Sequence, residues 1–257
     1  MSDIRNGSQV RAVPEISIVI PAHNEALRIA PTLREYARYF KDRIELIVVT
    51  NGCSDATYEV VSSLQQTLPS LLTVINVPGA IGKKGDAIIK GFRKAAGSLV
   101  GFVDADGATT PEEFDRLCAL LGTNDVVFGS RWMSGATVYN RTSPLRKCAS
   151  KSFVILVKIL FGLPYHDTQC GVKIVTRHAL NAILPHLSTA DSAIDVELLL
   201  LARRAGLAVR EEPTVWTDNN SSVYSTSLMK FFRTSFSMFR SLLRLRLKSY
   251  SIHSYET

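Results

Sequence analysis

The sequence lacks any long uncharged apolar run. No stretch of its 257 residues reaches the roughly 18 uncharged apolar residues that a membrane-spanning helix needs. The opening segment, MSDIRNGSQVRAVPE, also lacks the apolar core of a secretory signal peptide. We therefore expect a protein of the cytoplasm that has no spanning helix.

Cysteine is scarce, and no CxxC pair occurs. The four cysteines are widely separated: Cys53, Cys118, Cys148 and Cys170. This pattern argues against structural zinc and against a disulfide framework, so reduced thiols are expected. Internal repeats and low-complexity segments are absent as well.

Acidic residues are missing from the end of the chain, between Asp218 and Glu256. Six of the cationic residues lie there: Lys230, Arg233, Arg240, Arg244, Arg246 and Lys248. They account for most of the formal net charge of +7, so the rest of the chain is nearly neutral. A chain that binds nucleic acid would be basic throughout, whereas one basic aromatic segment is typical of contact with an anionic membrane.

What is present is a regular alternation of short apolar runs and helical segments, with 46% hydrophobic residues overall. The expected strands are 16–20, 45–49, 72–77, 99–104 and 125–129. The expected helices are 24–40, 55–67, 83–96 and 111–121. This alternation predicts an α/β fold with a mostly parallel sheet and helices on both faces.

The second half is less regular. We expect a strand at 172–176, helices near 176–185 and 192–205, and a strand at 208–213. Segment 141–163 reads as a helix that is basic first and apolar later, either a core helix or an amphipathic one. Segment 227–248 reads as a basic amphipathic helix, which could lie on a membrane, pack across the domain or join two copies.

The stretch VGFVDADGATTP (100–111) raises the main chemical question. Thr110 and Pro111 suit the start of a helix. Asp104 and Asp106 precede that cap, so helix capping does not explain them. Two carboxylates at the end of a buried strand, with Gly107 allowing close approach, suit a divalent cation that carries a diphosphate.

Polar clusters follow the other strands too. PAHNE (21–25) ends the first, where Asn24 suits an N-cap and Glu25 the first helical turn. TNGCSDAT (50–57) and GKKGDA (82–87) follow next, and Arg131 follows the fifth strand. Because parallel strands end at one edge of a sheet, these clusters predict a single crevice there.

In this order and spacing, the motifs PAHNE, NGCSDAT, GKKGDA, DADGATTP, GSR, DTQCGVK and DVELL resemble the family 2 glycosyltransferases of GT-A fold. Within that family they are most similar to the polyprenyl-phosphate hexosyltransferases, and to the glucosyl branch more than to the mannosyl one. The resemblance covers roughly residues 15–225. It implies a Rossmann-like, mixed and mostly parallel sheet with amphipathic interface helices.

The resemblance also assigns roles. It implies donor contacts at Pro21, Ala22, Glu25, Asn51, Lys84, Asp104, Ala105, Asp106, Asp167 and Gln169. Asp106, with Asp104, would hold Mg²⁺ or Mn²⁺, and Arg131, Arg146 and Ser150 would contact the acceptor phosphate. Asp195 and Glu197 match a second acidic pair. Two positions depart from the family pattern: Asn51 stands where an aspartate usually reads the base, and Ser222 stands where relatives often have lysine.

The implied reaction is an inverting, metal-dependent transfer of a hexose, glucose favoured, from a nucleotide sugar, UDP-glucose favoured, to a polyprenyl phosphate. Residues 15–226 would form the catalytic domain, after a flexible segment 1–14 and before the membrane-surface segment 227–257. The enzyme would then sit peripherally on the cytoplasmic face of a membrane. Three alternatives remain: transfer of mannose from GDP-mannose, transfer to a soluble hydroxyl with Asp195 as base, and a non-catalytic binding module.

Overall fold

The structure, a computed structural model, describes residues 13–79, 83–140, 144–219 and 228–253. For 144–149, 228–235 and 249–253 it describes the backbone alone. The segment 1–14, which we expected to be flexible, therefore lies almost wholly outside the described residues. The domain limits at 14 and 226 stay predictions.

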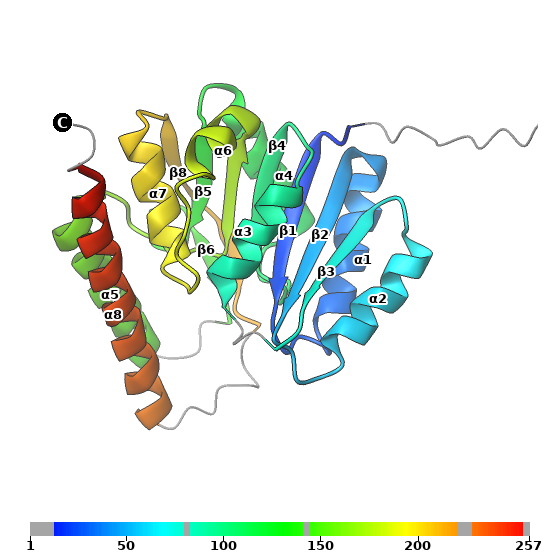
Figure 1. Ribbon diagram of the computed structural model, residues 1–257, viewed down its shortest axis with the longest axis horizontal. Helices are drawn as coiled ribbons and strands as arrows, with labels where there is room; N and C mark the ends of the chain where they lie inside the picture. Colours follow the sequence, from blue (N-terminus) through cyan, green and yellow to red (C-terminus); the bar gives the residue numbers. More distant parts are fainter. Residues whose placement is uncertain (1–12, 80–82, 141–143, 220–227, 254–257) are drawn as a thin grey trace, which may run out of the picture.

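A seven-stranded sheet forms the centre of the molecule (Figure 1). Its strand order is β3 (Leu72–Val77), β2 (Ile44–Asn51), β1 (Ile16–Ala22), β4 (Leu99–Val103), β7 (Val172–Thr176), β5 (Val126–Ser130) and β8 (Val209–Pro213). Only β7 runs against its neighbours β4 and β5; the other neighbouring strands of this sheet are parallel. The expectation of a mixed, mostly parallel sheet is confirmed.

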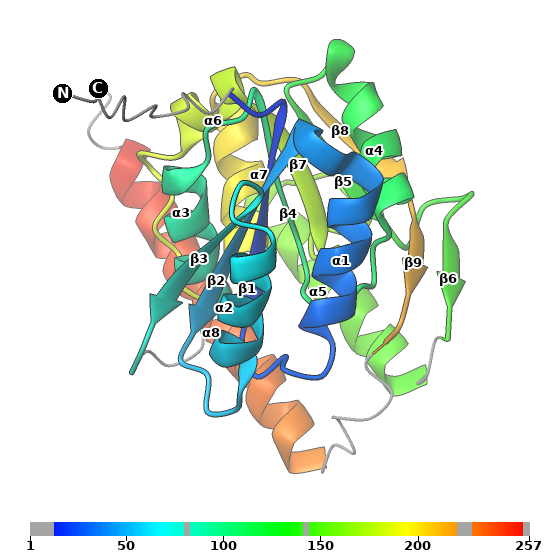
Figure 2. The same cartoon turned by 90° about the vertical axis from the view of Figure 1, so that its right-hand side faces the viewer.

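Helices cover both faces of this sheet (Figures 1 and 2). They are α1 (Ile29–Phe40), α2 (Thr57–Thr67), α3 (Lys84–Lys94), α4 (Pro111–Cys118), α5 (Pro144–Phe161), α6 (Arg177–Ile183), α7 (Ile194–Arg204) and α8 (Leu228–His253), with short 3-10 turns at Lys41–Arg43 and Ala119–Gly122. One core packs α1, α2 and α4 against side chains such as Ile18 and Leu46, while the other packs α3, α6 and α7 against Val19 and Ile47. The alternation of inward residues along each strand produces these two cores.

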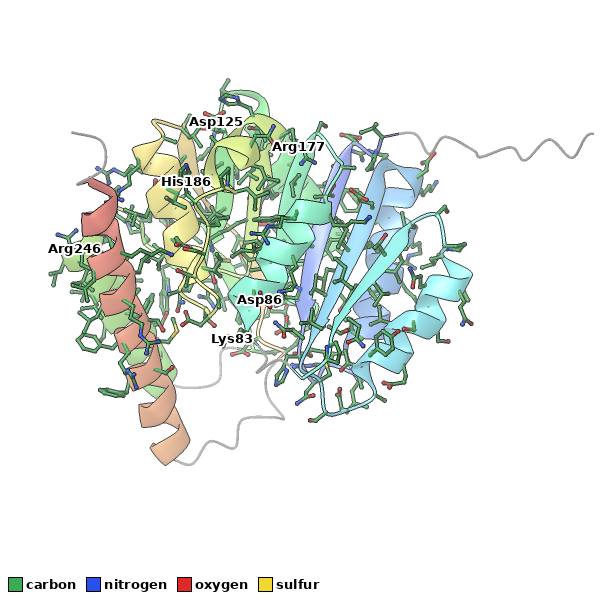
Figure 3. All side chains as sticks on the ribbon, in the orientation of Figure 1. Lys83, Asp86, Asp125, Arg177, His186 and Arg246 are labelled. Carbon is green, nitrogen blue, oxygen red and sulfur yellow. The ribbon has the colours of Figure 1, made fainter. Side chains whose placement is uncertain are left out.

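The carboxyl ends of β1, β2, β4 and β5 meet at one edge of the sheet, as the sequence predicted. Figure 3 shows Lys83 and Asp86, at the start of α3, near this edge. Asp125 and Arg177 lie at the opposite edge, because Asp125 precedes β5 and Arg177 follows the reversed β7. Four of the polar clusters therefore share one rim.

The loop after β1 differs from the prediction, since α1 begins at Ile29 rather than at residue 24. Asn24 is not its N-cap: it has a φ of 57°, and its Oδ1 accepts hydrogen bonds from the backbone N and Oγ of Ser54. Glu25 likewise precedes the helix, and both of its carboxylate oxygens bind the guanidinium of Arg28. The side chain of Asn24 thus ties the β1 and β2 loops together. By contrast, the predicted cap of α4 by Thr110 is confirmed.

A second, two-stranded sheet of β6 (Thr137–Tyr139) and β9 (Val215–Thr217) was not predicted. Strands of three residues carry too little periodicity to be recognised in a sequence. From β9 the backbone N of Thr217 donates to the carbonyl of Ala108, and the side-chain amide of Asn219 donates to the carbonyl of Asp106. The segment after β8 therefore braces the turn that carries the two aspartates.

The C-terminal helix packs on the domain over part of its length. Leu242 and Leu245 are buried with the core of α3, α6 and α7, and Ser241 donates to a carboxylate oxygen of Asp191 at 2.6 Å. Helix α8 contacts α5, as Figure 1 shows. The alternative of a helix packed across the domain is thus correct for one side of α8. Among the described residues, no helix combines the length and apolarity needed to cross a bilayer.

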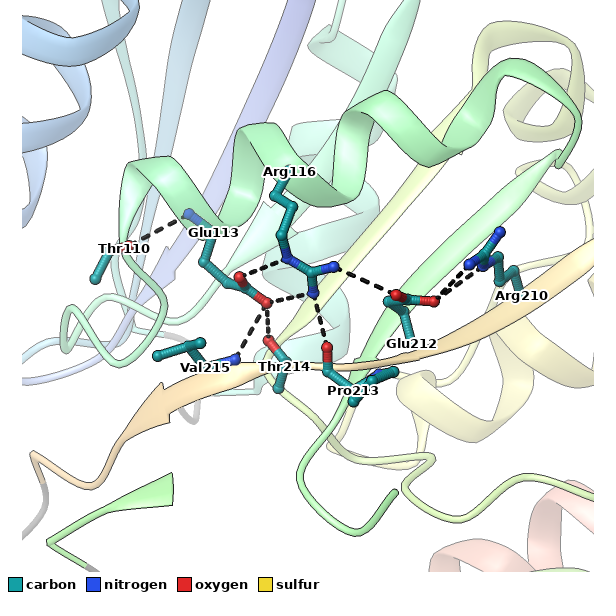
Figure 4. Close-up of polar contacts among 8 residues, drawn as sticks. All are labelled: Thr110, Glu113, Arg116, Arg210, Glu212, Pro213, Thr214 and Val215. Atoms are coloured by element: carbon teal, nitrogen blue, oxygen red, sulfur yellow. Dashed lines mark hydrogen bonds and ion pairs between the residues drawn. The ribbon is translucent and has the colours of Figure 1, made fainter. Parts of the chain in front are cut away.

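Glu113 anchors the segment 213–217 to α4 (Figure 4). Its buried carboxylate accepts hydrogen bonds from Arg116, from Oγ1 of Thr214 at 2.6 Å and from the backbone N of Val215 at 3.2 Å. Arg116 in turn donates to the carbonyl of Pro213 at 2.7 Å. Helix α4 directly follows the turn that carries Asp104 and Asp106. This cluster therefore joins that turn to the segment 213–217.

Glu113→Ala should lower the free energy of unfolding by about 3 kcal/mol, because it leaves a cation and two further donors without their buried acceptor. Urea denaturation measures this. Glu112→Ala, one exposed position earlier, makes the same charge change and should cost within about 0.5 kcal/mol. Equal losses in the two variants would contradict the anchoring role.

This contribution should also depend on pH. Burial alone would raise the pKa of Glu113, but hydrogen bonds from Arg116 and Thr214 outweigh it and hold the pKa below its ordinary value. The stabilisation is therefore complete above the pKa of the unfolded chain and disappears as the pH falls through the lower folded-state pKa. The difference in unfolding free energy between the wild type and Glu113→Ala should shrink in acid.

Candidate active site

Asp104 and Asp106 follow β4 at the carboxyl edge of the sheet. Asp104 lies one residue beyond the last strand residue, and its side chain is 37% exposed. The Oδ1 of Asp106 accepts a hydrogen bond from the backbone N of Ala108 at 3.1 Å, and Gly107 between them has a φ of 71°. This conformation favours glycine and turns the chain sharply. Burial, followed by the charge of Asp104, raises the pKa of Asp106.

Gly171 makes room for the Asp104 carboxylate. A Cβ added at Gly171 would lie 2.1 Å from Oδ2 of Asp104 and 2.7 Å from its Cγ. No side chain fits there unless Asp104 moves. The glycine of the DTQCG motif thus fixes where the first carboxylate can sit, which gives it a positioning role that the sequence did not reveal.

Asp104 begins a chain of alternating charges. Its Oδ1 lies 2.9 Å from Nζ of Lys84, which also lies 3.4 Å from Oδ2 of Asp195. The other oxygen of Asp195 is 2.6 Å from Nζ of Lys173, a fully buried lysine that also donates to the carbonyl of Cys170 at 3.0 Å. The carboxylates and ammonium groups alternate along this chain, which compensates charges that would otherwise be costly to bury.

The alternating charges fix the protonation states of these four side chains. Burial opposes the charged form of Lys84, but Asp104 and Asp195 outweigh it and raise the pKa of the lysine. Burial likewise opposes ionised Asp195, yet Lys173 and Lys84 lower the pKa of its carboxyl group. Asp195 is therefore a buried, weakly basic carboxylate, and its 2% exposure leaves little access for a substrate hydroxyl.

The donor set suits a divalent cation that arrives with a diphosphate. Within the described parts of the chain, no group of three or more histidine, cysteine or acidic side chains could hold a metal by itself. Mg²⁺ and Mn²⁺ are hard cations, and Mg²⁺ characteristically keeps its waters and binds through one or two carboxylates plus substrate phosphates. Asp106 and Asp104 supply those carboxylates, so the residues present fit such an ion.

Asn51, the last residue of β2, carries an unsatisfied acceptor. Its side chain is 2% exposed, and its Nδ2 donates to the carbonyl of Lys83 at 2.9 Å. Its Oδ1 is buried and has no hydrogen-bond partner in the described structure. A buried acceptor without a donor costs about 1–3 kcal/mol, so this oxygen is suited to an N–H group of a ligand.

The remaining donor-side residues lie along the same rim. Pro21 and Ala22 end β1, and the carbonyl of Ala22 accepts the Cys53 thiol at 3.6 Å. Ala105 is buried, and its carbonyl accepts from Oγ1 of Thr32 at 3.1 Å. Burial raises the pKa of Glu25 above its ordinary value. The charge of Arg28 opposes this rise without cancelling it, and the charge of Asp106 adds to it.

Arg131 lies at the rim, as predicted, but nitrogens of its guanidinium group already bind another side chain. Its Nε and Nη2 bind the two carboxylate oxygens of Asp167 at 2.7 and 3.0 Å, and its guanidinium stacks over the Trp216 ring at 5.1 Å. Asp167 is 1% exposed. The bidentate face expected for a phosphate thus holds Asp167 instead, and the acceptor role of Arg131 stays a prediction.

Of the other residues expected at the site, some hold nearby loops in place and some lie outside the described residues. The amide Nε2 of Gln169 donates to the carbonyl of Ser192 at 3.2 Å, which ties the DTQCG turn to the start of α7. Glu197 is 3% exposed and accepts from the backbone N of Ser188 and Thr189, so it supports that loop. Ser150 lies half-buried on α5, beside the backbone of Arg146. The Arg146 side chain and Ser222 lie outside the described residues.

Known proteins resemble this chain in sequence and in fold. The model of glycosyl transferase family 2 matches residues 17–184. The chain belongs to glycosyl transferase family 2. A dolichyl-phosphate beta-glucosyltransferase of Trichomonas vaginalis is 35% identical over 228 residues, covering 83% of this chain and 67% of the relative. One from Saccharomyces cerevisiae is 30% identical over 229 residues, covering 80% and 68%.

Solved structures share the fold of this glycosyltransferase. Glucosyl-3-phosphoglycerate synthase of Mycobacterium tuberculosis in complex with UDP aligns with a TM-score of 0.66 at 19% identity, over 92% of this chain and 81% of that one. The same synthase with Mn²⁺, UDP and glucosyl-3-phosphoglycerate aligns at 0.64 and 19%, over 91% and 80%. These likenesses confirm the expected GT-A architecture.

Gly171→Ala should lower kcat/KM for glycosyl transfer by about a hundredfold, because displacing a positioned group by an ångström costs a factor of this size. Steady-state kinetics measures it, and the unfolding free energy should change little. Gly122→Ala is the matched control, since a Cβ there has no atom within 4 Å. Unchanged kinetics in Gly171→Ala would contradict the positioning of Asp104.

Proposed function

We propose that this glycosyltransferase transfers glucose from UDP-glucose to a polyprenyl phosphate, with inversion at the anomeric carbon. The observation that carries the proposal is the carboxylate pair Asp104 and Asp106 beside Lys84, on the rim where α/β sheets bind nucleotides. The relatives named above, which carry the name dolichyl-phosphate beta-glucosyltransferase, support the sugar and the class of acceptor.

Asn51 favours uracil over guanine as the donor base. Uracil presents one ring N–H between two carbonyl groups, whereas guanine presents a ring N–H beside an amino group. A carboxylate could accept both guanine donors. Asn51 offers a single oxygen, because its amide nitrogen is held by the carbonyl of Lys83. One acceptor matches the single N–H of uracil.

At the diphosphate, a bound Mg²⁺ or Mn²⁺ would supply Lewis-acid stabilisation of the leaving group. Asp106 and Asp104 would hold that ion, and Lys84, which contacts Asp104, would add an ammonium group at the diphosphate. The carbon–oxygen bond to UDP breaks while an oxygen of the acceptor phosphate forms the new bond from the opposite side. UDP leaves with the electron pair of the broken bond.

A phosphate acceptor needs no poised general base. A phosphate oxygen is already ionised near neutral pH, so the attacking atom has no proton to lose. Asp195, the candidate base for a hydroxyl acceptor, is buried and its two oxygens face Lys173 and Lys84. These contacts favour a phosphate acceptor over transfer to a soluble hydroxyl.

A membrane surface would bring the acceptor within reach. Helix α5 exposes Ile155 and Ile159, and α8 exposes Phe236 and Leu247, each more than half exposed. Exposed arginines accompany them on α8, such as Arg240 and Arg244. In two views α8 begins at the same end of the molecule as the carboxyl ends of β1 and β2 (Figures 1 and 2). We therefore place this surface against anionic lipid headgroups; the cytoplasmic face stays a prediction.

A transfer assay with a short polyprenyl phosphate tests the reaction. We expect UDP-glucose with Mn²⁺ to give a glucosyl lipid phosphate, GDP-mannose to give at least about tenfold less, and free sugars to accept nothing. Asp106→Asn should reduce kcat by at least about a thousandfold while the protein stays folded. Transfer to free sugars alone, or an Asp106→Asn variant with full activity, would refute the proposal.

The membrane contact has a separate test. Ile159→Asp on α5 and Leu247→Asp on α8 should each weaken sedimentation with phosphatidylserine-containing vesicles by about tenfold, since each removes an apolar contact and adds a repelled charge. Val13→Asp controls for the charge change, because Val13 is 76% exposed, as Ile159 is, but lies away from both helices. If all three variants sediment like the wild type, α5 and α8 do not form the membrane surface.

A further inference from the structure

In this structure the Asp104 carboxylate is already occupied by a cation, the ammonium group of Lys84. The contact measures 2.9 Å to Oδ1, while Oδ2 lies in the space that a Cβ at Gly171 would take. A divalent ion shared by Asp104 and Asp106 would have to compete with this ammonium group for the same oxygen. Lys84 and such an ion therefore weaken one another's binding at Asp104.

Lys84 has a second, buried partner that the ion does not disturb. Its Nζ lies 3.4 Å from Oδ2 of Asp195, which is 2% exposed, and 5.3 Å from the centre of the Phe102 ring. The lysine side chain itself is 21% exposed, so its end reaches toward the rim. Lys84 is thus held by its buried contact with Asp195 and is accessible on the side of the rim. Its ammonium group can therefore turn about the contact with Asp195.

Lys173 keeps that anchor in place. It is fully buried, donates to Asp195 at 2.6 Å and to the carbonyl of Cys170 at 3.0 Å, and lies over the rings of Phe102 and Phe128. These contacts hold the ammonium group of Lys173 in place. Asp195 is thus fixed by one lysine and presents its second oxygen to the other, which no helix-capping role would require.

We propose that Lys84 holds the place of the divalent cation until the donor arrives, and that Asp195, fixed by Lys173, is the positioning residue about which Lys84 then turns onto the diphosphate. The inference rests on the proposed donor. It implies that the cation binds weakly alone, because Lys84 competes with it. The donor diphosphate relieves this competition by offering the ammonium group new oxygens, so nucleotide and cation bind cooperatively.

The test is Lys84→Met, studied by calorimetry in two titrations. Without the ammonium group, Mn²⁺ alone should bind about tenfold more tightly than to the wild type. With saturating Mn²⁺, UDP should bind about tenfold more weakly, because the diphosphate loses a cationic partner. Opposite signs distinguish this role from a merely structural one, which would weaken both. Lys90→Met is the matched control on α3, since Lys90 pairs with Asp86 and should leave both affinities unchanged.

Two more variants complete the test. Lys84→Arg retains the positive charge and should restore the weak binding of Mn²⁺ alone. Lys84→Gln removes the charge but keeps a polar side chain, and it should repeat the result of Lys84→Met if that variant folds poorly. Equal or weaker Mn²⁺ binding in the uncharged variants would overturn the inference. Failure of the wild type to bind UDP with Mn²⁺ would instead refute the proposed donor.

Discussion

The ion pair between Asp104 and Lys84 is the interaction on which the site depends. A carboxylate at the end of a buried strand needs compensation, and here it comes from Lys84 at the start of α3, the helix that leads into β4. Because Asp195 shares that lysine and Lys173 compensates Asp195, four charged side chains from four elements or loops hold one another in place. The rim can therefore carry carboxylates for a metal ion and still be stable without one.

The fold supplies rigid supports for this arrangement. Gly171, just before the reversed strand β7, leaves space for Asp104, and Asn219 binds the carbonyl of Asp106 from the opposite side. The buried Glu113 joins α4 to the segment that leads to Asn219, so the aspartate turn is braced before and after its two carboxylates. These backbone and packing constraints hold the two carboxylates in position.

Most of the architecture could be predicted from the sequence, because short apolar runs and the Thr110–Pro111 cap report local preferences. The crevice could also be predicted, since strand ends in a parallel sheet must meet. The loop at Asn24 could not, because its side chain binds the distant Ser54 rather than its own helix. Nor could the pairing of Arg131 with Asp167, or of Lys173 with Asp195: the motif letters give residue types, while pairing depends on how β5, β7 and α7 are placed in three dimensions.

The most direct test of the account is a crystal structure of the protein soaked with Mn²⁺ and UDP, with the metal located by anomalous scattering. The account predicts that Asp106 and Asp104 would hold one manganese ion at the diphosphate, with Nζ of Lys84 moved from Asp104 to a phosphate oxygen and still in contact with Asp195. A manganese ion bound away from these two carboxylates, or Lys84 still paired with Asp104 beside a bound ion, would contradict it.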